Sequence, residues 1–350
     1  MDIKRVVIIF GGYSTEYEVS LQSAYCVIKN IDSCKYEAIL IGITWDGRWY
    51  RYYGDAERIL DNTWHLDKSE CVPVILSPDR NTCKIIEIKD GLAKVRKIDI
   101  VFPVLHGKNG EDGTLQGLLE LAGIPFVGCG TLSSALCMDK DRAHKLVAME
   151  GIRVPPSVTL NRFFSERKML EQVSCLNYPL FVKPVKSGSS FGITKVFEKR
   201  ELYNAIINAF KHDDQVIVEE NIEGFEVGCA ILGNNELIMG EVDEIELTDG
   251  FFDYTEKYTL KSSKIHMPAR IDTITAIRIK KTAAVIYKAL GCKGFARVDM
   301  FLTPGKEVVF NEVNTIPGFT THSRYPNMMK GIGLQFPDIL DKLIQLGLEK

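Results

Sequence analysis

Short apolar runs alternate with amphipathic segments over the first third of the chain. The runs are rich in β-branched and aromatic residues, which predicts strands at Val6–Phe10, Ile39–Ile43, Ile100–Leu105 and Ile124–Val127. Apolar residues recur at helical spacing over 21–31 and Leu115–Ala122, which predicts helices between the strands. Trp45–Trp49 has the composition of a hairpin turn. This alternation favours an open parallel α/β sheet, whose ligands gather at the carboxyl ends of the strands.

The pattern changes near Thr131, where a second unit is predicted to begin. Ser133–Glu150 has helical spacing and ends at Gly151, and Pro155-Pro156 then interrupts the chain. Further along, the pattern predicts strands at Leu180–Pro184 and Val216–Glu220 and helices at Thr273–Leu290 and from Pro337 onward. We therefore expect three domains, at 1–130, 131–215 and 216–350.

Two alternating segments near the C-terminus place polar residues on one face of a predicted hairpin. The strands are Ala296–Phe301 and Val308–Asn314. The residues expected to share a face are Arg297 and Asp299 on the first strand and Phe310, Glu312 and Asn314 on the second.

The turn between these strands allows two registers. If Gly305-Lys306 is a two-residue loop, Asp299 faces Glu312. If Pro304-Gly305 is the loop, Arg297 faces Glu312 instead. Both registers bring the polar groups together.

Asp299, Glu312 and Asn314 form a set of oxygen ligands that suits Mg²⁺, which keeps open positions for phosphate oxygens. The alternative is a solvated sheet face with a surface ion pair. The polar, kinked segment Thr315–Arg324 favours the metal site, because a substrate loop following a ligand strand has this composition.

Three further segments have the composition of nucleotide-binding elements. Lys183–Gly192 is a small-residue loop after a strand, and such loops offer backbone N–H groups to phosphate. It is not a Walker A loop, and Gly11-Gly12 is not a dinucleotide fingerprint. Glu219–Ile222 follows a strand, with Glu226 close behind. The polar, aromatic segment Phe251–Ala269 is a candidate lid. Each is also compatible with an ordinary turn, strand end or surface loop.

Composition excludes several classes of function. A net charge of −3 and a pI near 6.1 give no basic footprint for nucleic acid. The longest apolar runs are too short to span a bilayer, and Met1–Arg5 leads directly into a strand without a signal peptide. The nine cysteines contain no C-x-x-C pair, as expected for buried thiols in a cytoplasmic protein.

Together these segments resemble the D-alanine–D-alanine ligases of the ATP-grasp superfamily. The resemblance runs from Phe10 to about Pro326. Its motifs, in the family's order, are Gly11–Ser20, Leu105–Gly113, Met138–Lys140, the Lys183 loop, Glu256–Tyr258, Arg297–Asp299 and Asn311–Tyr325. The resemblance implies an ATP-grasp fold, ATP and two Mg²⁺ ions (or Mn²⁺) as cofactors, and a homodimer.

The resemblance implies roles for the matching residues at the nucleotide. Lys140 and Lys183 would hold the α- and β-phosphates, Lys257 would reach the γ-phosphate, Glu219 and Ile222 would flank adenine, and Glu226 would bind ribose. Asp299, Glu312 and Asn314 would bind the Mg²⁺ ions.

It implies roles at the amino-acid substrates as well. Glu16, in a hydrogen-bonded set with Ser189 and Tyr258, would bind the ammonium of the first D-alanine, and His106 would lie near its carboxylate. Arg297 and the Gly318 amide would form the oxyanion hole, and Ser323 would hold the second substrate's carboxylate. The chemistry implied is γ-phosphoryl transfer to a carboxylate, followed by amine attack on the acyl phosphate.

Arg324 bears on the second substrate. Housekeeping ligases usually carry an apolar residue after the His-Ser pair, whereas this chain has Arg324 after His322-Ser323. With Glu256–Tyr258, this resembles the vancomycin-resistance ligases that make D-alanyl-D-serine, best of all the VanG type. A site that hydrogen-bonds a hydroxyl rejects an analogue lacking it. The alternative is that Arg324 points to solvent or pairs with a local acid. Lactate-using ligases are disfavoured, because they lack the Lys257-Tyr258 pair.

Three other readings remain open at this stage. The first is a housekeeping D-alanine–D-alanine ligase, and the second is another ATP-grasp carboxylate–amine ligase. The third is a non-catalytic nucleotide-binding regulator, which would be expected to have lost metal ligands or the oxyanion arginine. The Glu16 and Ser323 motifs argue against the second, and the complete set of competent side chains argues against the third.

Overall fold

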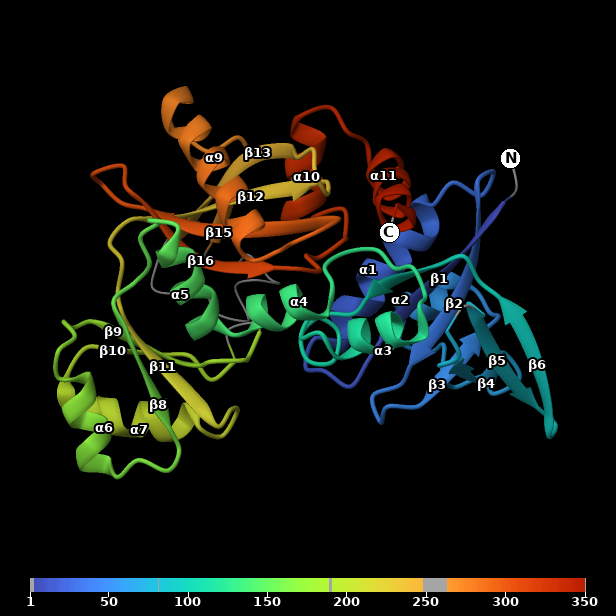
Figure 1. The fold of residues 1–350 in the computed structure, drawn as a ribbon, viewed down its shortest axis with the longest axis horizontal. Helices are drawn as coiled ribbons and strands as arrows, with labels where there is room; N and C mark the ends of the chain where they lie inside the picture. The colour runs from blue at the N-terminus through green and yellow to red at the C-terminus, as the bar shows by residue number, and fades with distance from the viewer. Residues whose placement is uncertain (1–2, 81, 189–190, 248–262, 350) are drawn as a thin grey trace.

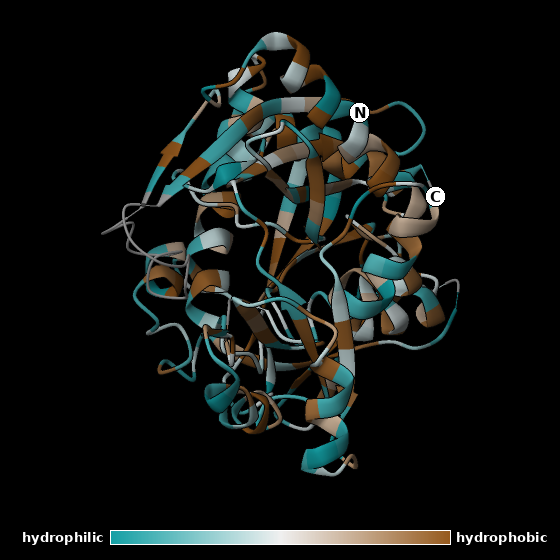
Figure 2. Cartoon of the chain, turned by 90° about the vertical axis from the view of Figure 1, so that its left-hand side faces the viewer, coloured by the Kyte–Doolittle hydropathy of each residue, from teal (hydrophilic) through white to brown (hydrophobic). Residues whose placement is uncertain are grey.

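Three sheets build the protein, and helices lie on and between them (Figure 1). The computed structural model describes residues 3–80, 82–188, 191–247 and 263–349. Figure 2 shows hydrophobic positions recurring along the strands and helices, as the sequence pattern predicted. None of the helices within these ranges is both long and apolar enough to cross a membrane.

The N-terminal sheet has seven strands in the order β6-β5-β4-β3-β2-β1-β7. Their bounds are β1 Lys4–Gly11, β2 Tyr36–Ile43, β3 Trp49–Tyr52, β4 Cys71–Leu76, β5 Lys84–Lys89, β6 Leu92–Lys97 and β7 Ile100–Val104. Strand β1 pairs in parallel with β2 and β7, whereas β3 to β6 extend the sheet in antiparallel fashion. The expectation of a parallel sheet is therefore correct for β2, β1 and β7 at one end of the sheet and wrong for β3 to β6.

Helices α1 (Tyr17–Asn30), α2 (Ala56–Leu60) and α3 (Thr114–Ala122) accompany this sheet. The predicted strand at Ile124–Val127 is wrong, since this segment forms a single parallel bridge from Phe126 to Val101. Strands β5 and β6 were not predicted, because half-exposed strands with charged residues lack a continuous apolar run. Strand β4 was not predicted either, although its sequence CVPVIL is apolar.

The central sheet has the order β10-β9-β11-β8, and each of its pairs is antiparallel. Its strands are β8 Ser157–Asn161, β9 Leu180–Pro184, β10 Thr194–Val196 and β11 Gln215–Glu220, with helices α6 Glu166–Val173 and α7 Lys199–Ala209. The strand predictions at β9 and β11 are confirmed. Because β11 belongs to this sheet, a division by sheets falls after Glu220. The expected domain limits remain a prediction.

The C-terminal sheet has the order β14-β13-β12-β15-β16. Its strands are β12 Phe225–Leu232, β13 Ile238–Leu247, β14 Ser263–His266, β15 Phe295–Leu302 and β16 Val308–Asn314. Helix α9 (Thr273–Ala289) packs on it with buried residues such as Ile279 and Ile286, and α10 (Arg324–Gly331) contacts β12 and β13.

The helix predicted at Ser133–Glu150 is two helices, α4 (Thr131–Met138) and α5 (Lys140–Met149). Asp139 separates them in an extended conformation, and its carboxylate accepts a hydrogen bond from the Arg142 N–H. This N-cap compensates for the break and sets Lys140 at the start of α5. Both helices contact β16, so they pack against the C-terminal sheet.

A bulge decides the register of the β15–β16 hairpin. Asp299 pairs with Glu312, as one of the two predicted registers required, but Met300 pairs with Phe310. The extra residue, Asn311, shifts Phe310 to the opposite face, where it is fully buried. The prediction that Phe310 shares a face with Glu312 is therefore wrong. The loop has three residues, Pro304 to Lys306, since the Thr303 N–H donates to the Glu307 carbonyl.

Helix α11 (Phe336–Leu348) returns to the N-terminal sheet, next to α1 (Figure 1). Its buried residues Ile339 and Leu343 join the core that includes Val6 and Leu21. The side chain of Asp341 accepts hydrogen bonds from Lys35 and Tyr36. The first and last parts of the chain therefore share one hydrophobic core.

Candidate active site

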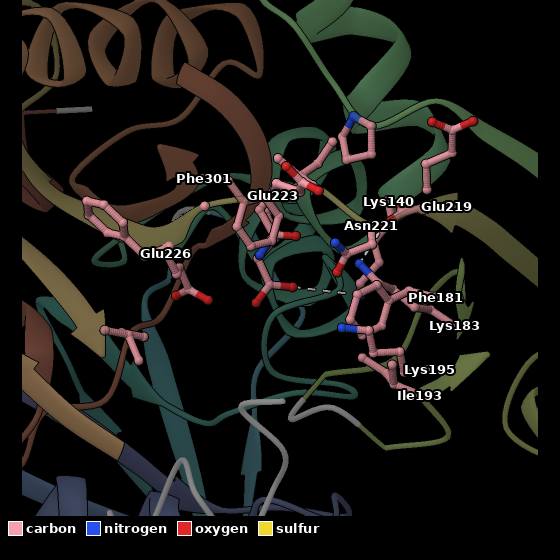
Figure 3. Close-up of a pocket in the computed structure, with 18 of the residues that line it drawn as sticks. Lys140, Phe181, Lys183, Ile193, Lys195, Glu219, Asn221, Glu223, Glu226 and Phe301 are labelled. Carbon is pink, nitrogen blue, oxygen red and sulfur yellow. Dashed lines mark hydrogen bonds and ion pairs between the residues drawn. The ribbon is translucent and has the colours of Figure 1, made fainter. Parts of the chain in front are cut away.

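A cavity of about 550 Å³ lies between the central and C-terminal sheets. We call it the nucleotide cavity after the role that the sequence resemblance implies for it, and its lining includes Lys140, Phe181, Lys183, Lys195, Glu219, Ile222, Glu226, Phe301 and Glu312. Figure 3 shows Phe181, Lys183 and Lys195 on one side of it and Glu226 and Phe301 on the other. A slot between two sheets with cations on one side has the form that a flat base and a phosphate chain require.

Lys183 and Glu219 form a buried ion pair across strands β9 and β11. The Lys183 Nζ donates to Glu219 Oε2 over 2.6 Å, and their backbones lie on neighbouring strands of one sheet. Burial would raise the pKa of Glu219, but the nearby Lys183 ammonium lowers it overall. Lys140 reaches the same cavity from α5, and its Nζ donates to the Ser187 carbonyl over 2.7 Å. Two cations are thus held a short distance from the small-residue loop.

A second cavity of about 440 Å³ is named here the acceptor cavity. It brings together residues far apart in sequence, and its lining includes Glu16, His106, Glu111, Glu226, Arg297, Asp299, Asn314, Gly318, Ser323 and Arg324. Glu226 lines both cavities, so they adjoin at β12.

Asp299 is the centre of the polar face of the hairpin. It is 1% exposed and accepts two hydrogen bonds from Arg297 Nε, at 2.8 and 3.1 Å, and one from Arg297 Nη2 at 2.7 Å. The Asn314 amide donates to it over 2.9 Å. Burial disfavours the charged guanidinium, yet Asp299 raises the pKa of Arg297. Glu312 Oε2 lies 4.0 Å from Lys140 Nζ.

Arg324 is buried among three carboxylates. Its guanidinium makes a bidentate pair with Asp243, with Nε to Oδ2 at 2.7 Å and Nη2 to Oδ1 at 2.8 Å. Its Nη1 donates to Glu226 over 2.8 Å and lies 3.4 Å from Asp299 Oδ1. Burial acts against the charge, but Asp243 and its neighbours raise the pKa of Arg324. The interpretation that Arg324 pairs with a local acid is confirmed, and the one that it points to solvent is wrong.

Gly228 makes the Arg324 pair possible. A Cβ at this position would lie 2.3 Å from Arg324 Nη2 and 2.7 Å from Asp243 Oδ1. Gly228 sits on β12, between Asp243 on β13 and Asp299 on β15. A glycine in the middle strand therefore leaves room for the guanidinium to lie over the sheet.

Glu16 and Ser323 also lie close to glycine backbones, where no Cβ would fit. A Cβ at Gly107 would lie 2.1 Å from Glu16 Oε2, and one at Gly188 would lie 2.9 Å from it. The Glu16 carboxylate thus sits between the loop after β7 and the loop after β9. A Cβ at Gly318 would lie 2.8 Å from Ser323 Oγ, so Gly318 and Ser323 are neighbours in the acceptor cavity.

The predicted site residues fall into these two neighbouring cavities. The structure brings Lys140, Lys183, Glu219, Ile222, Glu226 and Glu312 to the nucleotide cavity, and Glu16, His106, Arg297, Asp299, Asn314, Gly318, Ser323 and Arg324 to the acceptor cavity. Ser189, Lys257 and Tyr258 lie outside the described residues.

Sequence reasoning missed several lining residues. Phe181 and Phe301 were detectable, because strand alternation places them on the faces of Lys183 and Asp299. Glu111 of the acceptor cavity was not, and neither was Asp243, which pairs with Arg324 without lining either cavity, since their contacts join distant segments. In the described ranges, no cluster of three His, Cys, Asp or Glu side chains could hold a metal alone.

Family models match nearly the whole chain. The model described as D-ala D-ala ligase N-terminus matches residues 5–129, and the one described as D-ala D-ala ligase C-terminus matches 146–345. A D-alanine–D-alanine ligase of Caldicellulosiruptor bescii is 46% identical over 99% of this chain and 95% of its own length. The vancomycin C-type resistance protein VanC2 of Enterococcus casseliflavus is 42% identical, with 99% of each chain covered.

Solved structures agree with this grouping. The crystal structure of the VanG D-Ala:D-Ser ligase from Enterococcus faecalis is 65% identical, with a TM-score of 0.92 over 99% of this chain and 100% of that one. The fold of this chain is the ATP-grasp fold that the resemblance implied, preceded by an α/β domain. The chain belongs to the D-alanine–D-alanine ligase family.

Proposed function

We propose that the protein is a D-alanine–D-serine ligase that forms a D-alanyl phosphate from ATP and passes its acyl group to D-serine. The product would serve modified peptidoglycan precursors, as in vancomycin resistance. The observation that carries the choice of D-serine is the guanidinium of Arg324, which lines the acceptor cavity and is held by the buried Asp243. The 65% identity to the VanG D-Ala:D-Ser ligase supports the same choice.

A polar wall at this position favours a hydroxyl over a methyl group. Arg324 uses its Nε and one Nη2 hydrogen on Asp243 and one Nη1 hydrogen on Glu226. The second Nη2 hydrogen has no acceptor among the residues that the structure describes, so it is available to a substrate hydroxyl. D-Alanine would leave this donor unpaired in a buried place, which costs about 1–3 kcal/mol.

The nucleotide cavity supports the proposed binding of ATP. Lys140 and Lys183 would hold phosphates from the side of α5 and β9, and Lys257 would reach the γ-phosphate. Glu219 and Ile222 would flank the adenine, and Glu226 would bind the ribose.

The hairpin face fits Mg²⁺ by the chemistry of its donors. Asp299, Glu312 and Asn314 offer carboxylate and amide oxygens from one face of adjacent strands, next to the lysines of the nucleotide cavity. Bound Mg²⁺ ions would neutralise the phosphate charge during transfer. Asp299 is held in place by Arg297 and Asn314, so its carboxylate needs little reorganisation to serve as a ligand.

The acceptor cavity supports the roles proposed for the substrate groups. Glu16 would bind the ammonium of D-alanine with Ser189 and Tyr258. Arg297, buried and charged, would stabilise the oxyanion together with the Gly318 N–H. Ser323 is the N-cap residue of α10, and the helix N-terminus would attract the carboxylate of the second substrate.

The proposal is tested by phosphate release with D-alanine alone and then with D-serine added, followed by identification of the dipeptide. We expect slow release with D-alanine alone and release at least about ten times faster when D-serine is present, since a hydroxyl-binding site discriminates by more than this. Equal rates and D-alanyl-D-alanine as the main product would support the housekeeping activity named for the 46% identical relative. No release with either acceptor would contradict both.

Arg324→Leu should raise kcat/KM for D-alanine relative to D-serine. The substitution leaves Asp243 without its cation, so Arg324→Leu/Asp243→Asn is tested beside it to provide a folded variant. Arg278→Leu, which removes an exposed arginine of α9, is the matched control. An unchanged ratio of kcat/KM for the two acceptors in both variants would refute the role of Arg324.

A further inference from the structure

Side chains of the N-terminal third of the chain bind the backbone of the loop Ile316–Phe319. The Ile316 N–H donates to Glu111 Oε1 over 2.9 Å, and the Ile316 carbonyl lies 2.9 Å from His106 Nδ1. Both backbone polar groups of this residue are therefore bound by the segment that follows β7. The sequence separations exceed 200 residues, so these contacts join the N-terminal domain to the loop that leaves β16.

Ser23 on α1 binds the other end of the loop. The Phe319 N–H donates to Ser23 Oγ over 3.2 Å, and Ser23 Oγ lies 3.0 Å from His106 Nε2. Ser23 is fully buried, and Phe319 is 1% exposed. Ser23, His106 and Glu111 are named here the loop clamp.

The chemistry of the groups fixes the direction of each hydrogen bond in the clamp. A carbonyl can only accept, so His106 Nδ1 carries the hydrogen that points to Ile316. Nε2 of the neutral ring is then an acceptor and receives the Ser23 hydroxyl hydrogen, which leaves Ser23 Oγ to accept from Phe319. Burial lowers the pKa of His106 to about 4, which keeps the ring neutral at pH 7.

One N–H of the loop remains available. Ile316 and Phe319 have their N–H groups bound by the clamp, and Pro317 has none. The N–H of Gly318, between them, has no acceptor among the described residues, and Gly318 lines the acceptor cavity. The clamp thus binds backbone N–H groups on both sides of Gly318.

We propose that Ser23, His106 and Glu111 are positioning residues that hold the Gly318 N–H toward the oxyanion of the second reaction step. This assigns His106 a different role from a ligand of the first substrate's carboxylate, because both of its ring nitrogens are engaged within the protein. The inference rests on the proposed ligase chemistry, but it applies to D-serine and D-alanine as acceptors alike.

The role of His106 is tested by two amides that each keep one of its nitrogens. Asparagine places its NH₂ near the position of Nδ1 and can still donate to Ile316, whereas glutamine places its amide near Nε2 and cannot. We expect kcat for dipeptide formation to fall by less than about 5-fold in His106→Asn and by about 10-fold or more in His106→Gln, since leaving the buried Ile316 carbonyl without a donor costs more than losing a typical hydrogen bond. A substrate ligand would instead raise KM for the first D-alanine in both variants while kcat stayed constant.

Ser23→Ala tests the other end of the clamp, with Ser134→Ala as the matched control. Ser134 is equally buried, lies on α4, and its hydroxyl has no partner in the described part of the chain. We expect Ser23→Ala to lower kcat for dipeptide formation about 5- to 10-fold, and Ser134→Ala to leave it unchanged.

The two reaction steps are distinguished by positional isotope exchange in ¹⁸O-labelled ATP, in which the β,γ-bridging ¹⁸O moves to a non-bridging position of the β-phosphate when γ-phosphoryl transfer reverses. With D-alanine alone, this exchange reports formation of the acyl phosphate and should stay within about 2-fold of wild type in Ser23→Ala, because the Gly318 N–H acts later. An equal fall of exchange and dipeptide formation would overturn the proposal, as would a higher KM for the first D-alanine alone. If wild type releases no phosphate with either acceptor, the proposed function fails instead.

Discussion

The nucleotide cavity and the acceptor cavity are built in different ways. In the first, Lys183 and Glu219 pair across adjacent strands of one sheet, 36 residues apart in sequence. In the second, Arg324 reaches back 81 residues to Asp243 and 98 to Glu226, and Ile316 contacts Glu111 across 205 residues. The Lys183–Glu219 pair of the nucleotide cavity is thus a product of strand pairing, whereas the acceptor cavity depends on contacts of α10 with the C-terminal sheet and of the loop after β16 with the segment after β7.

This difference has a consequence for substitutions. A residue of the nucleotide cavity can be removed while its sheet keeps its other pairings, so the effect should appear mainly in ATP binding. A residue of the acceptor cavity also joins elements that pack together in the final fold, so stability and activity should change together.

Asp299→Asn should have the largest effect on activity, because Asp299 is the buried centre of the polar hairpin face. It removes the negative charge of a proposed metal ligand and of the partner of Arg297, so we expect kcat to fall by about 10³-fold or more, in keeping with several kcal/mol of charge stabilisation by the metal. ADP release at saturating substrates measures this. Glu307→Gln, an exposed acid on the same hairpin, is the control and should retain wild-type kcat. Similar kcat values for the two variants would contradict the metal assignment.

Arg324→Leu should have the largest effect on stability. It leaves Asp243, which is 1% exposed, without a cation beside Glu226 and Asp299, so the free energy of unfolding should fall by about 3–5 kcal/mol. Urea unfolding at pH 7 measures it. If the free energy of unfolding falls by less than about 1 kcal/mol, the ion pairs of Arg324 do not stabilise the fold, and the proposed difference between the two cavities is wrong.

Lys183→Met/Glu219→Gln should act mainly on ATP, and the second change avoids leaving the buried Glu219 carboxylate without its cation. Loss of a charge-assisted contact to phosphate is expected to raise KM for ATP by about 10- to 100-fold, with little change in KM for D-alanine. Lys186→Met is the control, since Lys186 is on the same loop but exposed and pairs with Asp213. A rise in KM for both substrates would mean that the two cavities are not separable.

Glu111→Gln should give the smallest and most specific effect, a change in the pH dependence of stability. Burial and the neighbouring Glu16 raise the pKa of Glu111 to about 8, so the native state retains a proton that the unfolded chain loses near pH 4.5. The stabilisation from this proton is complete below pH 4.5 and is lost as pH rises toward 8. The wild type should therefore lose stability relative to Glu111→Gln by up to about 1 kcal/mol per pH unit over this range.

Thermal unfolding of both proteins between pH 5 and pH 8 checks the Glu111 prediction. If the glutamine itself lowers stability, it does so equally at every pH. The test is therefore how the stability difference between the two proteins changes with pH. If the stability difference between wild type and Glu111→Gln does not change with pH, the pKa of Glu111 is the same in the folded and unfolded states, and the prediction is wrong.

The contrast between the cavities also explains what the sequence could predict. Strands β9 and β11 and the polar face of β15 were predictable, because apolar runs and period-two alternation are local signals. The pairing of Asp299 with Glu312 was one of two predicted registers. The Asn311 bulge and three-residue loop were not predicted, since alternation assumes that no extra residue is inserted.

Contacts between residues far apart in the sequence could not be predicted from local sequence patterns. Arg324 was singled out from its motif, but Asp243 lies on a strand whose neighbours cannot be read from periodicity. The same holds for Ser23 and Glu111, whose importance comes from contacts with a loop some 200 to 300 residues away. The motif indicated candidate residues, and the fold shows what they contact.

The return of α11 to the N-terminal sheet has a consequence for synthesis of the protein. Ile339 and Leu343 complete a core that begins with Val6 and Leu21, so one face of the N-terminal sheet stays partly uncovered until α11 has been synthesised. A nascent chain therefore exposes part of its earliest folded segment throughout translation. Separately expressed residues 1–130 should aggregate unless the helix at 336–348 is supplied in trans.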